Sequence, residues 1–421
     1  MNLEEICEKF GICAMAKKEI TKGIINNTSV VVDKSGNQYI LQEINTHVFK
    51  NIDGLMRNIE LVTDFIRNKI HQEGGDEKTG TLNLLKSNGK SYVEVFDELG
   101  DKHYFRMYDY ISSASTFDEA SDELLYEAGI GFGRFQRQLA DFPAEMLYES
   151  IPDFHNTLAR FEAFEQALHN AKTAGKQAVY KAVNEIKFAY ENVEYAGLIM
   201  NALNSGKIPY RVVHNDTKLN NVMLDNVTHK AVCLIDLDTI MPGSLLFDYG
   251  DGIRCSANNG KEDDLDLRNV SLSTNKFRQF TKGFLKETAS SLTEGELELM
   301  PYAPIVIAYE LGLRFLTDYL NGNVYFKCDG RRPDHNLERA KAQFKLANNM
   351  QENLPVMTEI ILEMFEKYKN RYIVQEQEQQ NENIKQIIAN EIVDVKGFEH
   401  EENVGSEIPE ELAEKNNKIF E

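Results

Sequence analysis

Three polar residues in one short stretch have the types and spacing that phosphoryl transfer requires. The segment HNDTKLNNVMLD contains Asp216 and, five residues later, Asn221, and the apolar run AVCLI that follows is continued by Asp236. Phosphoryl transfer needs one group that orients and deprotonates the attacking hydroxyl, and separate oxygen ligands for the metal that neutralises the phosphates. We expect Asp216 to accept the hydroxyl proton, and Asn221 and Asp236 to hold Mg²⁺ on ATP.

The polar neighbours of these residues allow two interpretations each. His214 either braces the loop or shuttles protons, and bracing is the role we expect. Lys218 either offsets phosphate charge or is a surface lysine, and Asp238 is either a second metal ligand or a solvated neighbour. In the segment LFDYGDGIR, Asp248 can orient the catalytic loop by accepting backbone N–H groups, whereas Asp251 is expected to be a local turn or helix-cap residue.

Apolar residues on either side of the motif would fix it on buried strands. Val212 and Val213 come directly before it, and Val232 and Leu234 come shortly before Asp236. A loop fixed in this way would keep its oxygen ligands where a metal needs them. The simplest alternative is that Asp and Asn occur here only as turn formers, which is their commonest use in loops.

The first hundred residues predict a small antiparallel sheet with one helix packed on it. TSVVVD (28–33) and YILQEI (39–44) flank the turn sequence KSGN, which favours a hairpin. Apolar residues over 53–70 recur at spacings of three and four, which is typical of an amphipathic helix. Further strand-like runs follow at 81–85, 91–96 and 103–111.

From about residue 117 the pattern becomes mainly helical. Helices are expected near 117–140, 157–172 and 176–204, with a strand-and-loop segment at 209–241 and more helices to about residue 372. We therefore expect an N-terminal nucleotide-binding lobe over 1–111, a helical lobe over 112–372 that carries the catalytic loop, and an acidic polar tail over 373–421. The tail has little apolar surface to offset the entropy of ordering, so we expect it to be flexible.

Composition and charge narrow the possible partners and compartment. The chain has 46 basic and 67 acidic residues, a formal net charge of -21 that repels nucleic acid and anionic lipid. No stretch approaches the roughly 18 apolar residues that a membrane span needs. The five cysteines are scattered and form no CxxC pair, which favours a reducing environment over a disulfide framework. We expect a cytoplasmic protein that binds neither nucleic acid nor membranes.

Several separated blocks carry a family resemblance. The chain resembles the aminoglycoside phosphotransferase and choline kinase superfamily, which has a protein-kinase-like fold, and within it is similar to the N-acetylhexosamine 1-kinases. The catalytic blocks indicate the superfamily, and the remaining blocks favour the narrower group. The blocks are GIINNT (23–28), YILQEINTHVFKNIDGLM (39–56), YFRMYDYI (104–111), FGRFQRQLADFP (132–143), IPDFHNT (151–157), HNDTKLNNVMLD (214–225), LIDLDTIMPGSLLFDYGDGIR (234–254), LRFLTDYLNGNVYFK (313–327) and HNLERAKAQ (335–343).

The resemblance implies a fold, a reaction and several site residues. It implies an α+β, two-lobed fold, with a small antiparallel sheet lobe that includes one long helix and a larger, mainly helical lobe. It also implies transfer of the ATP γ-phosphoryl group to the anomeric hydroxyl of N-acetylglucosamine or N-acetylgalactosamine, with Asp216 facing that hydroxyl. Arg314 and Tyr325 would contact the sugar, or else be a buried ion-pair partner and a core residue. Gly23 and Asn26 would lie in the loop over the nucleotide.

One strand departs from the expected pattern. Protein kinases place a phosphate-pairing lysine on the strand that here reads Leu41-Gln42-Glu43, and the hexosamine kinases are expected to have a basic residue where Glu43 stands. Strand alternation would turn Glu43 outward and leave Gln42 facing the nucleotide. Arg106 is a candidate for the hinge side of the cleft.

Two rival functions follow from the same residues. A kinase of the same fold could act on another alcohol, such as an aminoglycoside, choline or a different sugar. Choline would call for an aromatic cage, and the chain has no Trp. A catalytically silent ligand-binding protein is the second rival: Glu43 favours it, whereas the retained Asp216, Asn221 and Asp236 argue against it.

Overall fold

The computed structural model describes residues 2–20, 26–118 and 120–371. The chain divides into two units, Met1–Lys369 and Asn370–Glu421, and the described helices and strands all belong to the first. The tail expected over 373–421 and Gly23 lie outside the described residues. Among the helices of the described ranges, none is long and apolar enough to cross a membrane.

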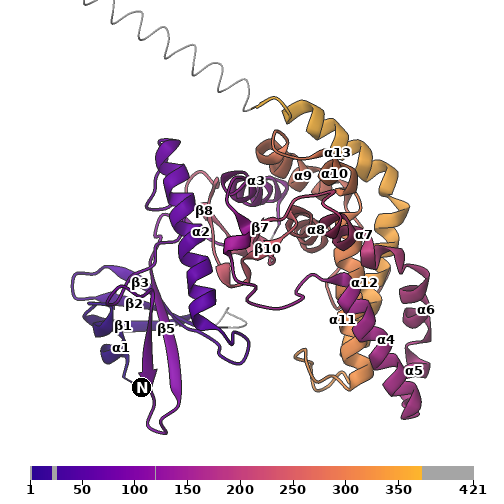
Figure 1. Ribbon diagram of the computed structural model, residues 1–421, viewed down its shortest axis with the longest axis horizontal. Helices are drawn as coiled ribbons and strands as arrows, with labels where there is room; N and C mark the ends of the chain where they lie inside the picture. The colour runs from indigo at the N-terminus through magenta and orange to yellow at the C-terminus, as the bar shows by residue number, and fades with distance from the viewer. Residues whose placement is uncertain (1, 21–25, 119, 372–421) are drawn as a thin grey trace, which may run out of the picture. The chain divides into compact units, whose positions relative to one another are not determined.

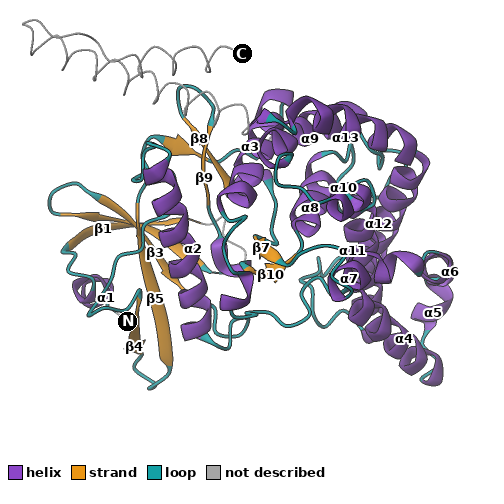
Figure 2. Ribbon diagram, turned by 45° about the horizontal axis from the view of Figure 1, so that its top comes forward, coloured by secondary structure: helices purple, strands orange, loops and turns teal. Residues whose placement is uncertain are grey.

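The N-terminal part is an antiparallel sheet with a helix on each face (Figures 1 and 2). The strand order is β1-β2-β3-β5-β4. Helix α2 (Ile52–Gln72) begins at the cap residue Asn51, whose side chain accepts the N–H of Gly54, and packs an apolar stripe that includes Ile59 and Val62 into the largest core. Helix α1 (Leu3–Lys9) packs on the other face. The strands are β1 (Ala14–Ile20), β2 (Asn27–Asp33), β3 (Gln38–Glu43), β4 (Tyr92–Phe96) and β5 (Lys102–Asp109).

Short strands and many helices make up the rest of this unit, so the expected mixed α+β architecture is confirmed. The strands are β6 (Ala114–Ser115), β7 (Arg211–Val213), β8 (Val222–Asp225), β9 (Ala231–Leu234) and β10 (Met241–Gly243). The helices are α3 (Asp122–Gln138), α4 (Thr157–Thr173), α5 (Gln177–Lys181), α6 (Val183–Glu191), α7 (Glu194–Asn204), α8 (Leu245–Ser256), α9 (Thr274–Thr288), α10 (Glu294–Leu299), α11 (Ala303–Asn321), α12 (His335–Glu352) and α13 (Leu354–Tyr368).

Three local expectations were wrong. Strand β1 was not anticipated because its sequence, AMAKKEI, is mostly exposed and lacks apolar alternation. The run 81–85 is not a strand; it follows β5 through a few hydrogen bonds, such as Leu85 N–H to the Met107 carbonyl at 2.9 Å. The single helix expected over 176–204 is three helices, with breaks at Ala182 and at Asn192.

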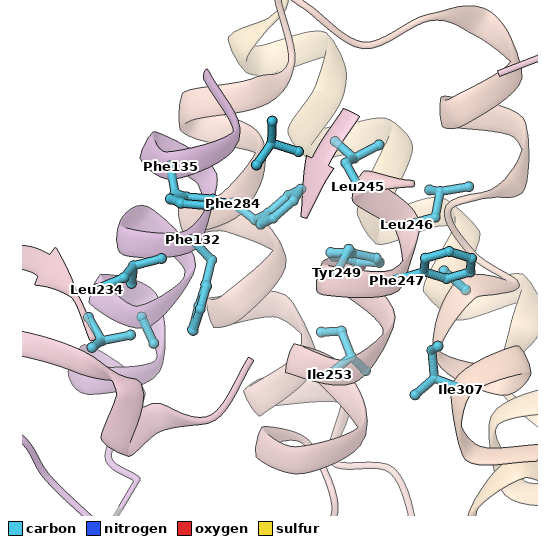
Figure 3. Packing of buried hydrophobic residues seen from close by; sticks show 14 of the residues in the cluster. Phe132, Phe135, Leu234, Leu245, Leu246, Phe247, Tyr249, Ile253, Phe284 and Ile307 are labelled. Atoms are coloured by element: carbon cyan, nitrogen blue, oxygen red, sulfur yellow. The ribbon is translucent and has the colours of Figure 1, made fainter. Parts of the chain in front are cut away.

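A tight helix pair supports the catalytic segment from behind. Helices α3 and α9 approach so closely that a Cβ on Gly129 would lie 2.3 Å from the Phe280 carbonyl oxygen, which requires glycine there. Figure 3 shows Phe132 and Phe135 of α3 and Tyr249 of α8 pointing into the same apolar layer. The catalytic loop is therefore built on a closely packed core, which resists displacement.

Candidate active site

The catalytic motif lies in the loop between two anchored strands. Strand β7, which precedes it, is buried throughout and pairs with β10, and strand β8, which follows it, pairs with β9. Asp236 comes after β9 and so returns to the start of β8, where the Ile235 N–H donates to the Asn221 carbonyl at 2.9 Å. The pairing of β7 with β10 and of β8 with β9 thus brings the separated parts of the motif together.

Asp248, in the first turn of α8, fixes the start of the catalytic loop. Its fully buried carboxylate accepts the backbone N–H groups of His214 at 2.9 Å and Asn215 at 2.8 Å, and the Gln136 side-chain amide at 2.7 Å. Burial raises the pKa of Asp248, and these donors oppose the rise. The expectation that Asp248 orients the loop through backbone N–H groups is confirmed.

Asp251, one turn later on α8, is a second anchor of the same loop. It accepts the Thr217 N–H at 3.0 Å and the Thr217 hydroxyl at 3.2 Å, and its other oxygen is paired with Arg254 at 2.7 Å. Burial opposes ionisation, but attraction by Arg254, with smaller contributions from His155 and Lys218, lowers the pKa of Asp251 to about 2. The expectation of a merely local turn or cap residue is wrong, because the carboxylate is charged and holds the residue next to Asp216.

His214 braces the motif from inside the core. Its Nε2 lies 3.0 Å from the Ile235 carbonyl oxygen, directly before Asp236, and its ring meets Phe132 and Phe135 edge-on. The side chain is completely buried, so it has no path for exchanging protons with solvent. This is the bracing role that the sequence favoured.

Asp216 is half-buried, and both of its carboxylate oxygens have partners. Lys218 Nζ lies 2.6 Å from Oδ1, and Asn221 Nδ2 donates to Oδ2 at 3.0 Å and to the Asp216 carbonyl at 2.9 Å. Although burial favours a neutral amine, the ion pair with Asp216 raises the pKa of Lys218. The Asp216 carboxylate is thus held in one orientation with the Lys218 ammonium group beside it. Asn221 uses its amide nitrogen for these contacts, so its amide oxygen can bind another partner.

Asp236 and Asn221 form a donor set that suits a divalent metal. Asp236 has a left-handed backbone, with φ 61°, and its side chain reaches solvent. Burial of the carboxyl by neighbouring protein raises the pKa of Asp236, and repulsion from Asp238 and Asp216 raises it further. A bound cation would relieve that repulsion. In the described part of the chain, no three His, Cys, Asp or Glu side chains gather as a metal site.

A buried arginine lies on the strand next to the one on which protein kinases have their lysine. Arg106 of β5, paired across the sheet with Gln42 of β3, donates from Nε to the Gln42 side chain at 2.9 Å and forms a buried ion pair with Asp238. Asp238 also accepts from Asn26, and Gln42 donates to Thr28 at 3.0 Å. Asp238 is therefore a buried partner of the sheet and not a solvated neighbour, whereas the hinge-side position of Arg106 stays a prediction.

Glu43 faces away from this network. His103 Nδ1 lies 2.6 Å from one carboxylate oxygen of Glu43, and Asn27 donates to the other at 3.0 Å. The hydrogen bond with Glu43 raises the pKa of His103. Because Glu43 and Gln42 alternate along β3, the acid lies on the face opposite Arg106. Glu43 therefore need not repel a phosphate on the Gln42 side.

The residues expected to contact the acceptor lie on α11 and in the loop that follows it. Arg314 lies over the rings of Phe154 at 5.6 Å and Phe326 at 5.5 Å, and Tyr325 is 73% exposed, with its N–H bound to Asp318 at 2.9 Å. None of the contacts of Arg314 and Tyr325 with other described residues reaches Asp216, and α11, which carries Arg314, packs against α8. Tyr325 is not a core residue. Among the described residues Arg314 forms no ion pair within 4.0 Å, although, against the effect of burial, its charge helps His155 to lower the pKa of Glu310.

Comparison with known proteins decides the family. The family model described as "Phosphotransferase enzyme family" (APH) matches residues 18–270, more than half of the chain. The chain belongs to this family. The matched range contains the sheet, the catalytic loop and helix α8, so family membership covers Asp216, Asn221 and Asp236.

Solved structures show the same fold at low sequence identity. An aminoglycoside phosphotransferase from Alicyclobacillus acidocaldarius subsp. acidocaldarius aligns with a TM-score of 0.53 and 13% identity, over 86% of this chain and 97% of that one. Amicoumacin kinase hAmiN, in complex with AMP-PNP, Ca²⁺ and Ami, aligns with a TM-score of 0.50 and 15% identity, over 78% of this chain and 87% of that one. At such identities the likeness concerns the fold alone: the chain has the fold of small-molecule kinases.

Proposed function

We propose that the chain is an ATP-dependent kinase that phosphorylates the anomeric hydroxyl of N-acetylhexosamines, such as N-acetylglucosamine and N-acetylgalactosamine. The observation that carries the proposal is that Asp216, Asn221 and Asp236 lie in the segments that join the β7–β10 and β8–β9 strand pairs in a member of a phosphotransferase family. The choice of acceptor rests on the resemblance of the segments outside the catalytic motif. Arg314 and Tyr325 support it, because a guanidinium donates to sugar hydroxyls and an exposed aromatic ring covers sugar C–H groups.

In the proposed reaction the anomeric oxygen attacks the γ-phosphorus of ATP. The bond from that phosphorus to the β–γ bridging oxygen breaks, ADP leaves, and the hydroxyl proton passes to the carboxylate of Asp216. An anomeric hydroxyl is more acidic than an ordinary alcohol, so it gives up its proton without strong base catalysis, late in a loose transition state. Lys218 and Asn221 hold the Asp216 carboxylate that would receive this proton. Position and electrostatics supply most of the acceleration.

Mg²⁺, when bound, neutralises charge on the transferring phosphoryl group. Asn221 and Asp236 would hold it, and Lys218 would place its ammonium group beside the same phosphate. The amicoumacin kinase, crystallised with AMP-PNP and Ca²⁺, supports a nucleotide with a divalent metal in this fold.

The sheet side of the site is proposed to hold the remaining phosphates. Asn26 donates to Asp238, Gln42 faces the same side of the sheet as Arg106, and Gly23 is proposed to lie over the nucleotide together with them. Gln42 itself has no charge. The buried guanidinium of Arg106 behind it is ion-paired with Asp238, so we propose that Gln42 and Asn26 contact the phosphates through hydrogen bonds.

A product assay tests the proposal. The full chain is incubated with ATP, Mg²⁺ and, separately, N-acetylglucosamine, N-acetylgalactosamine, glucose, choline and a kanamycin-type aminoglycoside, and the position of any new phosphate is assigned by ³¹P NMR. We expect a sugar 1-phosphate from the N-acetylhexosamines. Asp216→Asn should lower kcat by about 10²- to 10⁴-fold. Asp101→Asn, in the exposed β4–β5 hairpin, is the matched control and should leave kcat unchanged. Phosphorylation of choline or the aminoglycoside alone would overturn the acceptor assignment.

A further inference from the structure

The end of the helical lobe next to the catalytic loop contains polar groups without partners. His155, directly before α4, is 9% exposed, and its Nδ1 lies 2.9 Å from Glu310 Oε1 on α11. Thr157 donates to the other oxygen of Glu310 at 2.7 Å. The remaining ring nitrogen of His155, Nε2, is shielded from solvent and has no hydrogen-bond partner among the described residues. A buried ring nitrogen without a partner is costly unless a ligand completes it.

Two arginines lie beside this histidine, and neither forms an ion pair within 4.0 Å among the described residues. Arg160, in the first turn of α4, donates from one terminal nitrogen to the Phe154 carbonyl at 3.1 Å, and its Nε is buried without a partner. Arg314 is placed over the ring of the same Phe154. Burial lowers the pKa of Arg160, and repulsion from Arg314 lowers it further. The fully buried Glu310 attracts both arginines, but its carboxylate oxygens are already bound to His155 and Thr157.

This cluster adjoins the catalytic machinery through α8. The His155 ring packs on Phe247 with ring centroids 5.1 Å apart, and Phe247 lies on α8 next to Asp248. The charge of His155 also contributes to the lowered pKa of Asp251, which holds the Thr217 N–H. Residues of α4 and α11 therefore reach the same helix that positions Asp216.

We propose that Arg160 and His155, together with Arg314, form the wall of the acceptor site and select an uncharged sugar that carries hydroxyl and carbonyl groups, while rejecting amines. The inference rests on the proposed function, which it deepens by naming two specificity-determining residues. A sugar hydroxyl both donates and accepts, so it completes His155 Nε2 in either protonation state of the ring. A carbonyl such as that of an acetamido group accepts from the guanidinium groups. An ammonium group would meet two like charges in a partly buried site, which is strongly unfavourable.

Comparing two sugars that differ only in this respect tests the inference. N-acetylglucosamine and glucosamine share every hydroxyl, but at a pH where its amine is protonated glucosamine carries a positive charge in place of the acetamido group. Their dissociation constants are measured by calorimetry on the full chain, and kcat/KM is measured with ATP and Mg²⁺. We expect wild type to bind N-acetylglucosamine at least about tenfold more tightly.

Three variants separate charge from packing. Arg160→Gln should weaken the binding of N-acetylglucosamine about tenfold and raise KM more than it lowers kcat. The same change should strengthen the binding of glucosamine, so the ratio of the two dissociation constants should fall or reverse. Arg160→Lys keeps the charge and should still reject glucosamine. Arg268→Gln removes an exposed arginine that is paired only with nearby Asp266, and should change nothing. Thermal melts of all variants identify any loss of folding. If Arg160→Gln unfolds, the inference is tested by Arg160→Lys, which should still prefer N-acetylglucosamine over glucosamine.

Several outcomes would overturn the inference. These are equal affinity of the two sugars in wild type, no binding of either, or a preference within twofold of wild type in folded Arg160→Gln. The proposed function fails separately. Suppose that wild type forms no N-acetylhexosamine 1-phosphate but phosphorylates another neutral sugar, and that Arg160→Gln lowers kcat/KM for that sugar. The inference about Arg160 would then hold although the proposed function had failed. If the accepted substrate is choline or an aminoglycoside, both fall.

Discussion

The catalytic loop and the arginine cluster beside α11 differ in how completely their polar groups are paired. In the loop, both oxygens of the Asp248 and Asp251 carboxylates accept hydrogen bonds, and these fix the backbone around Asp216. His214 is paired through Nε2 only, and its Nδ1 is buried without a partner among the described residues. In the cluster, Arg160 and His155 each keep a buried nitrogen without a partner, and these two lie within one small group of side chains. The paired carboxylates define a rigid frame, and the cluster is where we propose that a ligand completes the structure.

The two regions also differ in charge. The protein carries a net charge of -21, and its catalytic loop gathers Asp216, Asp236 and Asp238, an arrangement that favours a divalent metal. The proposed acceptor end gathers two cations, Arg160 and Arg314, near the carboxylates of Glu310 and Asp153. Net charge therefore says little about the acceptor, because local potential decides which substrate is bound.

Replacing Asp236 should have the largest effect on activity. Asp236→Asn removes the anionic metal ligand and should lower kcat/KM by about 10²- to 10³-fold, because metal electrostatics are worth several kcal/mol in the transition state. The same change should raise the Tm of the free protein near neutral pH. Steady-state kinetics and thermal melts with and without ATP and Mg²⁺ check both, with Asp101→Asn as control.

The direction of the stability change follows from the sign of the pKa shift. The pKa of Asp236 is raised in the folded state, so the native protein holds this proton more tightly than the unfolded chain does. The ionised carboxylate therefore costs stability above the folded-state pKa, and the cost vanishes below the ordinary Asp value. A fall in Tm of free Asp236→Asn near neutral pH would contradict this account.

Replacing Asp248 should have the next largest effect, here on folding. Asp248→Ala leaves two buried backbone N–H groups and the Gln136 amide without an acceptor, which should cost about 2–4 kcal/mol of unfolding free energy. Urea denaturation measures the loss. The kcat value should fall as well, because the backbone that leads to Asp216 loses its anchor. A loss below about 0.5 kcal/mol would show that the loop does not depend on this carboxylate.

Replacing Arg314 should have the smallest effect on stability. Arg314→Met keeps an apolar stem between the two rings, so the unfolding free energy should change by no more than about 1 kcal/mol. KM for the acceptor should rise about tenfold, whereas KM for ATP stays constant. Asp248→Ala should therefore mainly lower the unfolding free energy, whereas Arg314→Met should mainly raise KM for the acceptor. Equal rises in both KM values would place Arg314 in the frame.

The catalytic loop could be predicted from the sequence because its parts are close along the chain. Asp216 and Asn221 are five residues apart, and Asp236 follows the next two apolar segments, so spacing and alternation were enough to group them. The orienting role of Asp248 could be inferred as well. The spacing of residues could not show that Asp251 is a second anchor. Asp251 meets Thr217 because α8 follows β10, and β10 pairs with β7, the strand that leads into the catalytic loop.

The other contacts depend on pairing between distant segments. Arg106 and Asp238 are 132 residues apart, and His155 and Glu310 are 155 residues apart, so no local pattern predicts either pair. Arg106 lies opposite Gln42 because β3 pairs with β5. The sequence does not reveal this pairing, since it depends on the order of the strands in the sheet. Strand β1 was missed because an exposed edge strand does not need apolar alternation.

A crystal structure of the full chain with AMP-PNP, Mg²⁺ and N-acetylglucosamine tests the central claim most directly. We predict one Mg²⁺ at about 2.1 Å from the Asn221 side-chain oxygen and from an Asp236 oxygen, and the anomeric hydroxyl within hydrogen-bond distance of Asp216. A metal bound away from both ligands, or a sugar whose anomeric carbon faces away from Asp216, would contradict the account.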